Sequence, residues 1–184
     1  MGAITPIGTG KEAFWNAMME GKNGIGRITR FDPEGFHAQI AGEVKDFDPT
    51  DYIDKKESKR MDRYTQFAVA TAGMAIKDAG LDLEKENLER IGTYVGTGIG
   101  GIETMHSQYE KYFAKGPSRI SPFFVPMMIA NMAAGQVSIE YKLHGPSSCV
   151  VTACATGTNC IGDAFRVIQH GGADVMLAGG TEAA

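Results

Sequence analysis

Hydrophobic residues along this chain recur with two different spacings, one typical of helices and one typical of buried strands. Apolar positions three to four residues apart predict helices at 11–20, 58–79, 102–115 and 130–141. Short apolar runs predict strands at 40–44, 91–95, 150–152 and 173–178. Because strands and helices alternate in the second half of this order, we expect an α/β fold with a largely parallel sheet covered on both faces.

The segment Ser147–Phe165 combines a strand prediction, several small residues and a cysteine. The run Val150–Thr152 predicts a buried strand, and the residues after Cys154 predict a helix with one apolar face formed by Ile161, Ala164, Phe165 and Ile168. Cys154 is therefore expected at a strand-to-helix corner. The free N–H groups and the dipole of a helix N-terminus favour an anion, so a thiolate and a nearby oxyanion would both be stabilised there. A buried, inert cysteine is the alternative interpretation.

Composition and charge exclude several classes of protein. The 184 residues are 43% hydrophobic and 22% charged, an ordinary globular composition, and the formal net charge of −4 argues against nucleic-acid binding. No apolar run approaches the ~20 residues that cross a bilayer, and no secretory signal pattern opens the chain. Three cysteines without CxxC or Cys/His spacing predict neither a disulfide scaffold nor a metal site, and a reducing cytoplasm fits best.

The turn GTGIGG, residues 96–101, satisfies the pattern G-x-G-x-x-G between a predicted strand and a predicted helix. A dinucleotide site also needs an acidic side chain about 20 residues further on, and residues 116–126 contain none. We therefore reject that cofactor and interpret the glycines as allowing close passage of the backbone beside another element. Ile99, the bulky residue of the turn, would then be free to face a ligand.

A basic run and four histidines complete the candidate chemistry. The segment 54–63 carries Lys55, Lys56, Lys59, Arg60 and Arg63, which would either bind an acidic partner or form a solvated helix face. Arg119 is a candidate extension of this basic surface. None of the histidines is convincingly placed as a base for a nucleophilic cysteine, namely His37, His106, His144 and His170. The apolar cluster at 123–132 predicts core packing, a subunit interface or the wall of an alkyl pocket.

Six motifs in order resemble the β-ketoacyl-[acyl-carrier-protein] synthases, and within them the synthase II type of bacterial type II fatty acid synthesis. They are TPIG at 5–8, RMDRYTQFA at 60–68, GTGIGG at 96–101, SPFFVPMMIANMAAGQ at 121–136, TACATG at 152–157 and DVMLAGGTEA at 174–183. The resemblance implies a thiolase-like fold of two similar α/β halves in five layers, usually as a homodimer. Residues 1–184 are then expected to be the first half, incomplete at both ends and without its opening strand.

The same resemblance implies roles for individual residues. Cys154 matches the nucleophile that accepts the acyl group, Ile99 the gate to the acyl pocket, and Phe124 the residue with which the partner subunit closes that pocket. Lys56, Lys59 and Arg60 match the residues that dock the acidic acyl carrier protein, with Arg119 as a candidate addition. No cofactor is implied.

The implied reaction is the decarboxylating condensation of an acyl thioester with malonyl-[acyl-carrier protein] to give 3-oxoacyl-[acyl-carrier protein]. The family takes two histidines and a lysine from its second half, so residues 1–184 alone are not expected to turn over. The alternatives are a polyketide ketosynthase, a thiolase, and a noncatalytic chain-length or interaction partner.

Overall fold

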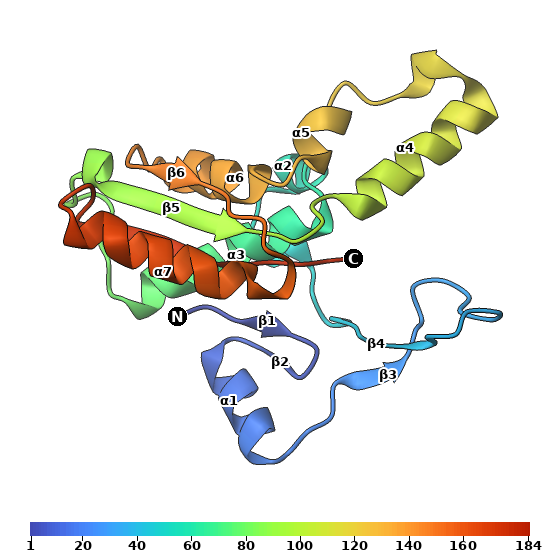
Figure 1. Cartoon of the computed structure of the whole chain (residues 1–184), viewed down its shortest axis with the longest axis horizontal. Coiled ribbons are helices and arrows are strands. Elements are labelled where there is room, and N and C mark those ends of the chain that lie inside the picture. Colours follow the sequence, from blue (N-terminus) through green and yellow to red (C-terminus); the bar gives the residue numbers. More distant parts are fainter.

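The computed structural model describes residues 1–184 and has a three-stranded parallel sheet at its centre (Figure 1). Its strands are β6 (Ser147–Ser148), β5 (Ile91–Gly96) and β7 (Val175–Gly180), in that spatial order. β5 pairs with β7 along its whole length, from Ile91 opposite Val175 to Gly96 opposite Gly180. Five of the six residues of β5 are buried, as expected for the central strand of a parallel sheet.

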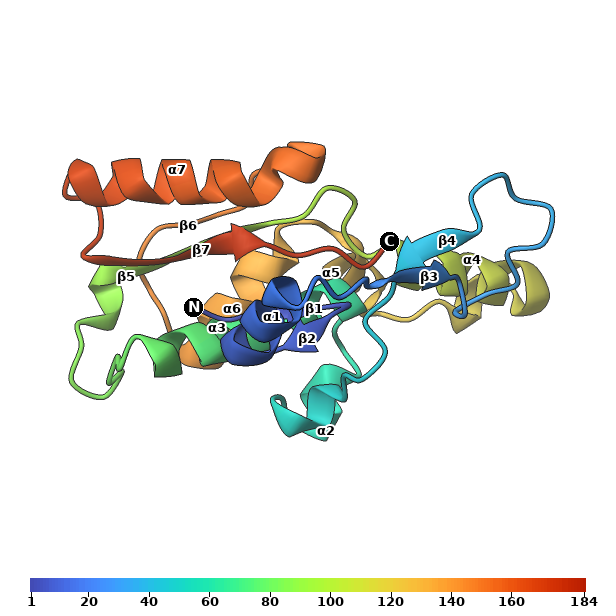
Figure 2. The same cartoon turned by 90° about the horizontal axis from the view of Figure 1, so that it is seen from below.

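Helices cover both faces of this sheet (Figure 2). Helix α7 (Thr156–Gln169) lies on one face, while α3 (Arg63–Asp78) and α6 (Met132–Tyr141) lie on the other. The main core joins α3, β5 and α6, and its most deeply buried side chains include Tyr64, Val69, Ile91 and Val137. The predicted covered parallel sheet is therefore confirmed.

The remaining elements surround this core. The first quarter of the chain forms two antiparallel hairpins outside the central sheet, separated by α1 (Lys11–Met19). In the first, β1 (Ile4–Thr5) pairs with β2 (Gly8–Thr9), and in the second, β3 (Ile25–Arg27) pairs with β4 (Ile40–Gly42). Helices α4 (Ile102–Lys115) and α5 (Phe124–Met128) extend away from the sheet (Figure 1). Short 3₁₀ turns are η1 (Pro49–Asp51), η2 (Leu88–Arg90), η3 (Pro117–Arg119) and η4 (Ala153–Ala155). No helix has the combination of length and apolar character that spanning a membrane requires.

Glycines in the left-handed region follow the ends of three predicted helices. Gly21, Gly80 and Gly116 have φ angles of 67°, 64° and 81°, which other residues adopt only with strain. These stops explain why α1 and α4 match their predicted ranges within one residue.

The helix predicted over 58–79 begins too early, because a break separates Ser58 from the helix that fills most of this range. Helix α2 (Lys55–Ser58) ends first, and α3 begins only at Arg63. Asp62 interrupts the helix, since its backbone is extended and its carboxylate accepts a hydrogen bond from the amide of Tyr64. Met61 lies in the break and is still buried, so the apolar stripe continues although the helix does not.

The strand predictions also need correction. Residues 150–152 form no strand, and the side chain of Val151 is 55% exposed. After Ser148 the chain crosses over the end of β5, where the carbonyl of Val150 lies directly above Gly96. The predicted strand at 173–178 is β7, but it is only partly buried because it forms an edge of the sheet. The predicted strand at 40–44 shortens to β4, which pairs outside the central sheet.

Candidate active site

Cys154 is the middle residue of the 3₁₀ turn η4, two residues before Thr156, the first residue of α7. The structure thus places it at a helix N-terminus, although the segment that leads to it has no regular secondary structure. Ala153 has a φ of 51°, a left-handed conformation that is strained for a residue other than glycine. The resulting sharp turn leaves Cys154 exposed, as in a nucleophile elbow.

Hydrogen bonds within residues 152–159 hold this corner in shape. The amide of Thr152 donates to the hydroxyl of Thr156 at 2.9 Å, and the Thr152 hydroxyl donates to Asn159 Oδ1 at 3.0 Å. No side chain caps the N-terminus of α7. The amide of its first residue, Thr156, donates to the Ala153 carbonyl of η4, and the positive end of the α7 dipole lies beside Cys154.

The other two cysteines have different surroundings. Cys160 is fully buried, and burial raises the pKa of its thiol. Cys149 is half-buried, its Sγ lies 3.4 Å from the carbonyl oxygen of Ala130, and burial raises its pKa as well. Because the thiolate is the reactive form, these two thiols are the inert ones, and Cys154 is the accessible one.

A cavity of about 540 Å³ brings Cys154 and Ile99 together. Its size lies within the usual range for small-molecule sites. The cavity is lined by Thr97, Gly98, Ile99, Ala153, Cys154, Thr156, Gly157, Gly180, Thr181 and Glu182. These residues come from the ends of β5 and β7 and from the start of α7, so the carboxyl edge of the sheet forms the site.

The turn that carries Ile99 packs tightly against the Cys154 corner. A Cβ atom on Gly98 would lie 3.2 Å from Ala153 Cα and 2.9 Å from Glu182 Oε2. Gly101 is equally confined, since a Cβ there would overlap the carbonyl of Met127. The interpretation that the glycines permit close backbone passage is confirmed.

Glu182 was missed by sequence reasoning, although it belongs to the quoted motif DVMLAGGTEA. Its carboxylate accepts hydrogen bonds from the Thr97 hydroxyl at 3.0 Å and from the amide of Gly98 at 2.8 Å. It thereby connects the end of β7 with the Ile99 turn. An acidic residue directly after an apolar strand that ends in two glycines was the available signal.

The other predicted site residues lie outside this cavity. Phe124 opens α5 and is half-buried; α5 itself packs on the end of the Ile99 turn, since the amide of Gly101 donates to the carbonyl of Met128 at 2.9 Å. No histidine lines the cavity. The ring of His170 instead contacts the Arg166 carbonyl, and His106 lies 3.4 Å from Glu110.

The basic residues divide into two groups. Lys56 in α2 and Lys59 after it are exposed and have no ion-pair partner, whereas Arg60 pairs with Glu57 at 3.0 Å and its guanidinium lies 4.9 Å from the ring centre of Phe123. Arg119 belongs to η3, which lies at the end of α4 far from α2 in both views (Figures 1 and 2). The structure therefore does not join Arg119 to the other three.

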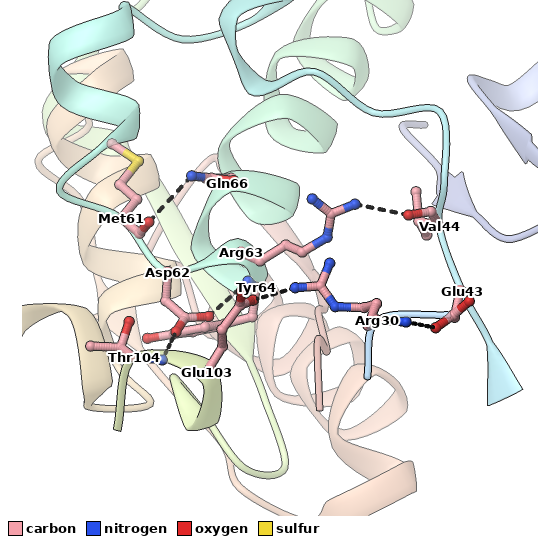
Figure 3. A network of polar contacts seen from close by, with 10 residues as sticks. All are labelled: Arg30, Glu43, Val44, Met61, Asp62, Arg63, Tyr64, Gln66, Glu103 and Thr104. Atoms are coloured by element: carbon pink, nitrogen blue, oxygen red, sulfur yellow. Dashed lines mark hydrogen bonds and ion pairs between the residues drawn. The ribbon is translucent and has the colours of Figure 1, made fainter. Parts of the chain in front are cut away.

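Asp62 links the start of α3 to the start of α4 (Figure 3). It is only 3% exposed, and its carboxylate accepts from the amides of Tyr64, at the start of α3, and Thr104, at the start of α4. The preceding residue of α4, Glu103, pairs with Arg30 at 2.7 Å. Sequence reasoning missed Asp62 as well; an aspartate just before an apolar helix is a recognised N-cap signal.

Comparison with known proteins agrees with this geometry. The chain is 52% identical over 183 residues to 3-oxoacyl-[acyl-carrier-protein] synthase 2 of Staphylococcus aureus, covering all of this chain and 45% of that protein. It is 53% identical over 184 residues to the protein of the same name from Synechocystis sp. (strain ATCC 27184 / PCC 6803 / Kazusa), covering 44% of it. The chain thus spans a little under half the length of these relatives.

Solved structures share the fold. The ishigamide ketosynthase/chain length factor superposes with a TM-score of 0.89 at 33% identity, over 100% of this chain and 46% of that one. A β-ketoacyl synthase from Burkholderia phymatum STM815 gives 0.80 at 27% identity, over 96% of this chain and 44% of that one. The expected thiolase-like α/β fold is confirmed.

The sequence profile of the family "Beta-ketoacyl synthase, N-terminal domain" matches residues 1–184. This match spans the Cys154 corner, the Ile99 turn and the sheet that positions them, so the chain belongs to the β-ketoacyl synthase family.

Proposed function

We propose that the protein to which this chain belongs is a condensing enzyme of fatty acid elongation, which joins an acyl thioester to malonyl-[acyl-carrier protein] with loss of carbon dioxide. The observation that carries the proposal is the exposed Cys154 at the uncapped N-terminus of α7, in a cavity shared with Ile99. Two relatives at 52–53% identity are named as synthases of this type.

In the first half-reaction, the Cys154 thiolate attacks the carbonyl carbon of the acyl thioester. A sulfur–carbon bond forms at Cys154, the carrier's sulfur–carbon bond breaks, and the carrier thiolate leaves and takes up a proton. The amides at the start of α7 stabilise the negative charge that develops on the carbonyl oxygen.

In the second half-reaction, malonyl-[acyl-carrier protein] loses carbon dioxide and leaves a carbanion equivalent on the carrier thioester. This carbon attacks the acyl group on Cys154, a carbon–carbon bond forms, and the thiolate of Cys154 is released. We propose that the histidines and the lysine for this step come from a second half of the protein, with residues 1–184 as its N-terminal half.

The proposal extends to the acyl pocket and the partners. Ile99 is the gate beside Cys154, and Phe124, on the α5 helix outside the cavity, closes the pocket of a second subunit in a homodimer. Lys56, Lys59 and Arg60 bind the acidic carrier, and a structure of a related polyketide ketosynthase in complex with its acyl-carrier protein supports a docking partner of this kind. Three free cysteines suit a reducing compartment, for which we propose the cytoplasm.

A polyketide ketosynthase is the second candidate. It is favoured by the ishigamide ketosynthase/chain length factor and by the AntDE ketosynthase bound to a hexaketide, which superpose at TM-scores of 0.89 and 0.85. Sequence identity is only 33% and 25% to these proteins, compared with 52–53% to the synthases 2, which favours the fatty acid substrate.

Intact-mass measurement of the full-length protein after exposure to acyl-[acyl-carrier protein] tests the proposal. We expect one acyl adduct, its absence in Cys154→Ala, and its retention in the matched thiol variant Cys149→Ala. With malonyl-[acyl-carrier protein] added, the wild type should release carbon dioxide and a chain two carbons longer. An adduct that persists in Cys154→Ala would contradict the proposal, and a strong preference for polyketide intermediates would support the second candidate.

A further inference from the structure

The cavity beside Cys154 contains one other ionisable side chain, that of Glu182. The reaction outlined above gives this carboxylate no role. Both of its oxygens face the Ile99 turn: Oε1 accepts from the Thr97 hydroxyl at 3.0 Å, and Oε2 accepts from the Gly98 amide at 2.8 Å.

These bonds continue across the turn. Thr97 is 1% exposed, and its hydroxyl oxygen also accepts a hydrogen bond from the amide of Gly100 at 3.2 Å. Glu182 therefore holds the residue before Ile99 directly and the residue after it through Thr97. A hydroxyl that donates to the carboxylate and accepts from Gly100 has a defined orientation.

The backbone next to Glu182 is held in place by two hydrogen bonds. The preceding residue, Thr181, donates its amide to the Gly96 carbonyl at 3.0 Å and its hydroxyl to the Tyr64 carbonyl at 2.6 Å. These two bonds tie the backbone next to Glu182 to the end of β5 and to the start of α3.

Little else restrains the Ile99 side chain. It is 57% exposed, and it stands between two glycines, one of which has a φ of 79°. Glycines give the backbone wide freedom, so a turn of this kind keeps one conformation only where other groups hold it. The Glu182 carboxylate holds the turn on the side of Thr97 and Gly98, and the Gly101 amide, which donates to the Met128 carbonyl, holds its far end.

We propose that Glu182 is a positioning residue, which holds the Ile99 turn against the Cys154 corner and so sets the length of acyl chain that Cys154 accepts. This inference rests on the proposed function. While the turn is held, Ile99 occupies part of the cavity beside Cys154, and a long chain must displace it. A short acyl chain fits without displacing Ile99. Releasing the turn should therefore raise the acylation rate for long chains and leave the rate for short chains unchanged.

The test compares acylation rates of Cys154 in the full-length protein, using saturated acyl carrier proteins of increasing chain length and intact-mass detection. In Glu182→Ala we expect the ratio of long-chain to short-chain rates to rise about tenfold, because hydrogen bonds to a charged group contribute on this scale. Glu182→Gln keeps one carbonyl acceptor and should give an intermediate ratio. Glu140→Gln is the matched control, since Glu140 is exposed and makes no hydrogen bond or ion pair, and its ratio should equal that of the wild type.

Thr97→Val is a second variant that removes the hydroxyl and retains the side-chain shape. It should shift the ratio in the same direction as Glu182→Ala, and it decides the question if Glu182→Ala does not fold. An unchanged ratio in these folded variants, or an equal loss of rate at every chain length, overturns the inference while acylation of the wild type upholds the proposed function. A wild type that never acylates contradicts the proposed function instead.

Discussion

The candidate site depends on two small residues, Gly98 and Ala153. The absence of a side chain on Gly98 lets the Ile99 turn approach Ala153, and Ala153 keeps a left-handed backbone, strained for a residue with a Cβ atom, that turns Cys154 outward. The chemistry of Cys154 thus requires its neighbours to be small, which the sequence pattern already indicated. Glu182 was not predictable in the same way, because its partners Thr97 and Gly98 lie about 85 positions earlier in the chain.

Substitution of Gly98 by alanine tests this close packing. A Cβ at this position would lie 2.9 Å from the Glu182 carboxylate and 3.2 Å from Ala153 Cα, so we expect a loss of about 1–3 kcal/mol in the free energy of unfolding. Gly162→Ala is the control, because Gly162 lies in α7 with open space around it and should gain roughly 0.5–1 kcal/mol. Urea unfolding measures the free energy of unfolding of both variants. Equal values for Gly98→Ala and Gly162→Ala would contradict the close packing at Gly98.

A pH dependence is expected from the buried tyrosine Tyr64. Burial raises the pKa of Tyr64 to about 12, and its hydroxyl donates to the Ile129 carbonyl at 2.6 Å. The tyrosine of the unfolded chain titrates near pH 10, so between pH 10 and 12 the unfolded chain loses a proton that the folded protein keeps. The stabilisation is therefore complete below pH 10 and is lost as the pH rises through 12, by about 2–3 kcal/mol.

Unfolding free energies measured across this alkaline range check the expectation. Tyr64→Phe is the comparison, because it removes the titrating group and retains the ring. Its free energy of unfolding should fall less steeply above pH 10 than that of the wild type. Parallel curves would show that Tyr64 does not cause the slope.

Among the elements, the helix ends followed by a glycine were predicted accurately, and the start of α3, which depends on tertiary contacts, was not. The glycine at 116 made the end of α4, and with it the range 102–115, predictable. The spacing of apolar residues, in contrast, gives no sign of the boundary between α2 and α3. That break follows from Asp62, whose carboxylate also reaches Thr104, 42 positions away. Periodicity indicates which residues face the core. Met61 faces the core although it lies in the break between the two helices, so the apolar pattern does not reveal the break.

Asp62→Ala should destabilise two helices at once. It removes the acceptor for the Tyr64 and Thr104 amides in a buried position, and loss of one N-cap costs about 0.5–2 kcal/mol, so we expect roughly 2–4 kcal/mol in urea unfolding. Asp62→Asn keeps a capping oxygen and should lose less. Asp54→Ala is the control, since Asp54 caps only the four-residue α2 in an exposed position and should cost about 1 kcal/mol or less. Equal effects of Asp62→Ala and Asp54→Ala would exclude the double cap.

For the whole molecule, the alternation of strands and helices was enough to predict a covered parallel sheet, but not the order of its strands. β5 comes first along the chain and lies in the middle, between β6 and β7, which places the residues after β5 beside those after β7. The cavity depends on this neighbourhood, because Ile99 follows one strand and Glu182 follows the other. Local periodicity contains no information on which strands are neighbours, so the turn, the carboxylate and Cys154 could be predicted only separately or through resemblance to a family.

The surface charge leads to the last prediction, which concerns the carrier protein. Lys56 and Lys59 are exposed cations without ion-pair partners in a chain with a formal net charge of −4, so they form a local basic surface on an acidic protein. Arg60 is already paired with Glu57, so we expect the two lysines to contribute more to carrier binding. Electrostatic attraction acts mainly on encounter and weakens with salt.

Lys56→Glu/Lys59→Glu in the full-length protein should therefore raise the KM for acyl-[acyl-carrier protein] by about tenfold and leave kcat nearly unchanged. The difference from the wild type should shrink as salt is added, and Lys22→Glu, a single charge reversal at an exposed residue in the loop after α1, should change KM little. A small pantetheine thioester has no acidic protein surface, so its kinetics should be the same in the double variant and the wild type. If the double variant loses activity equally on both substrates, the two lysines support the fold or the chemistry, and the carrier must dock elsewhere.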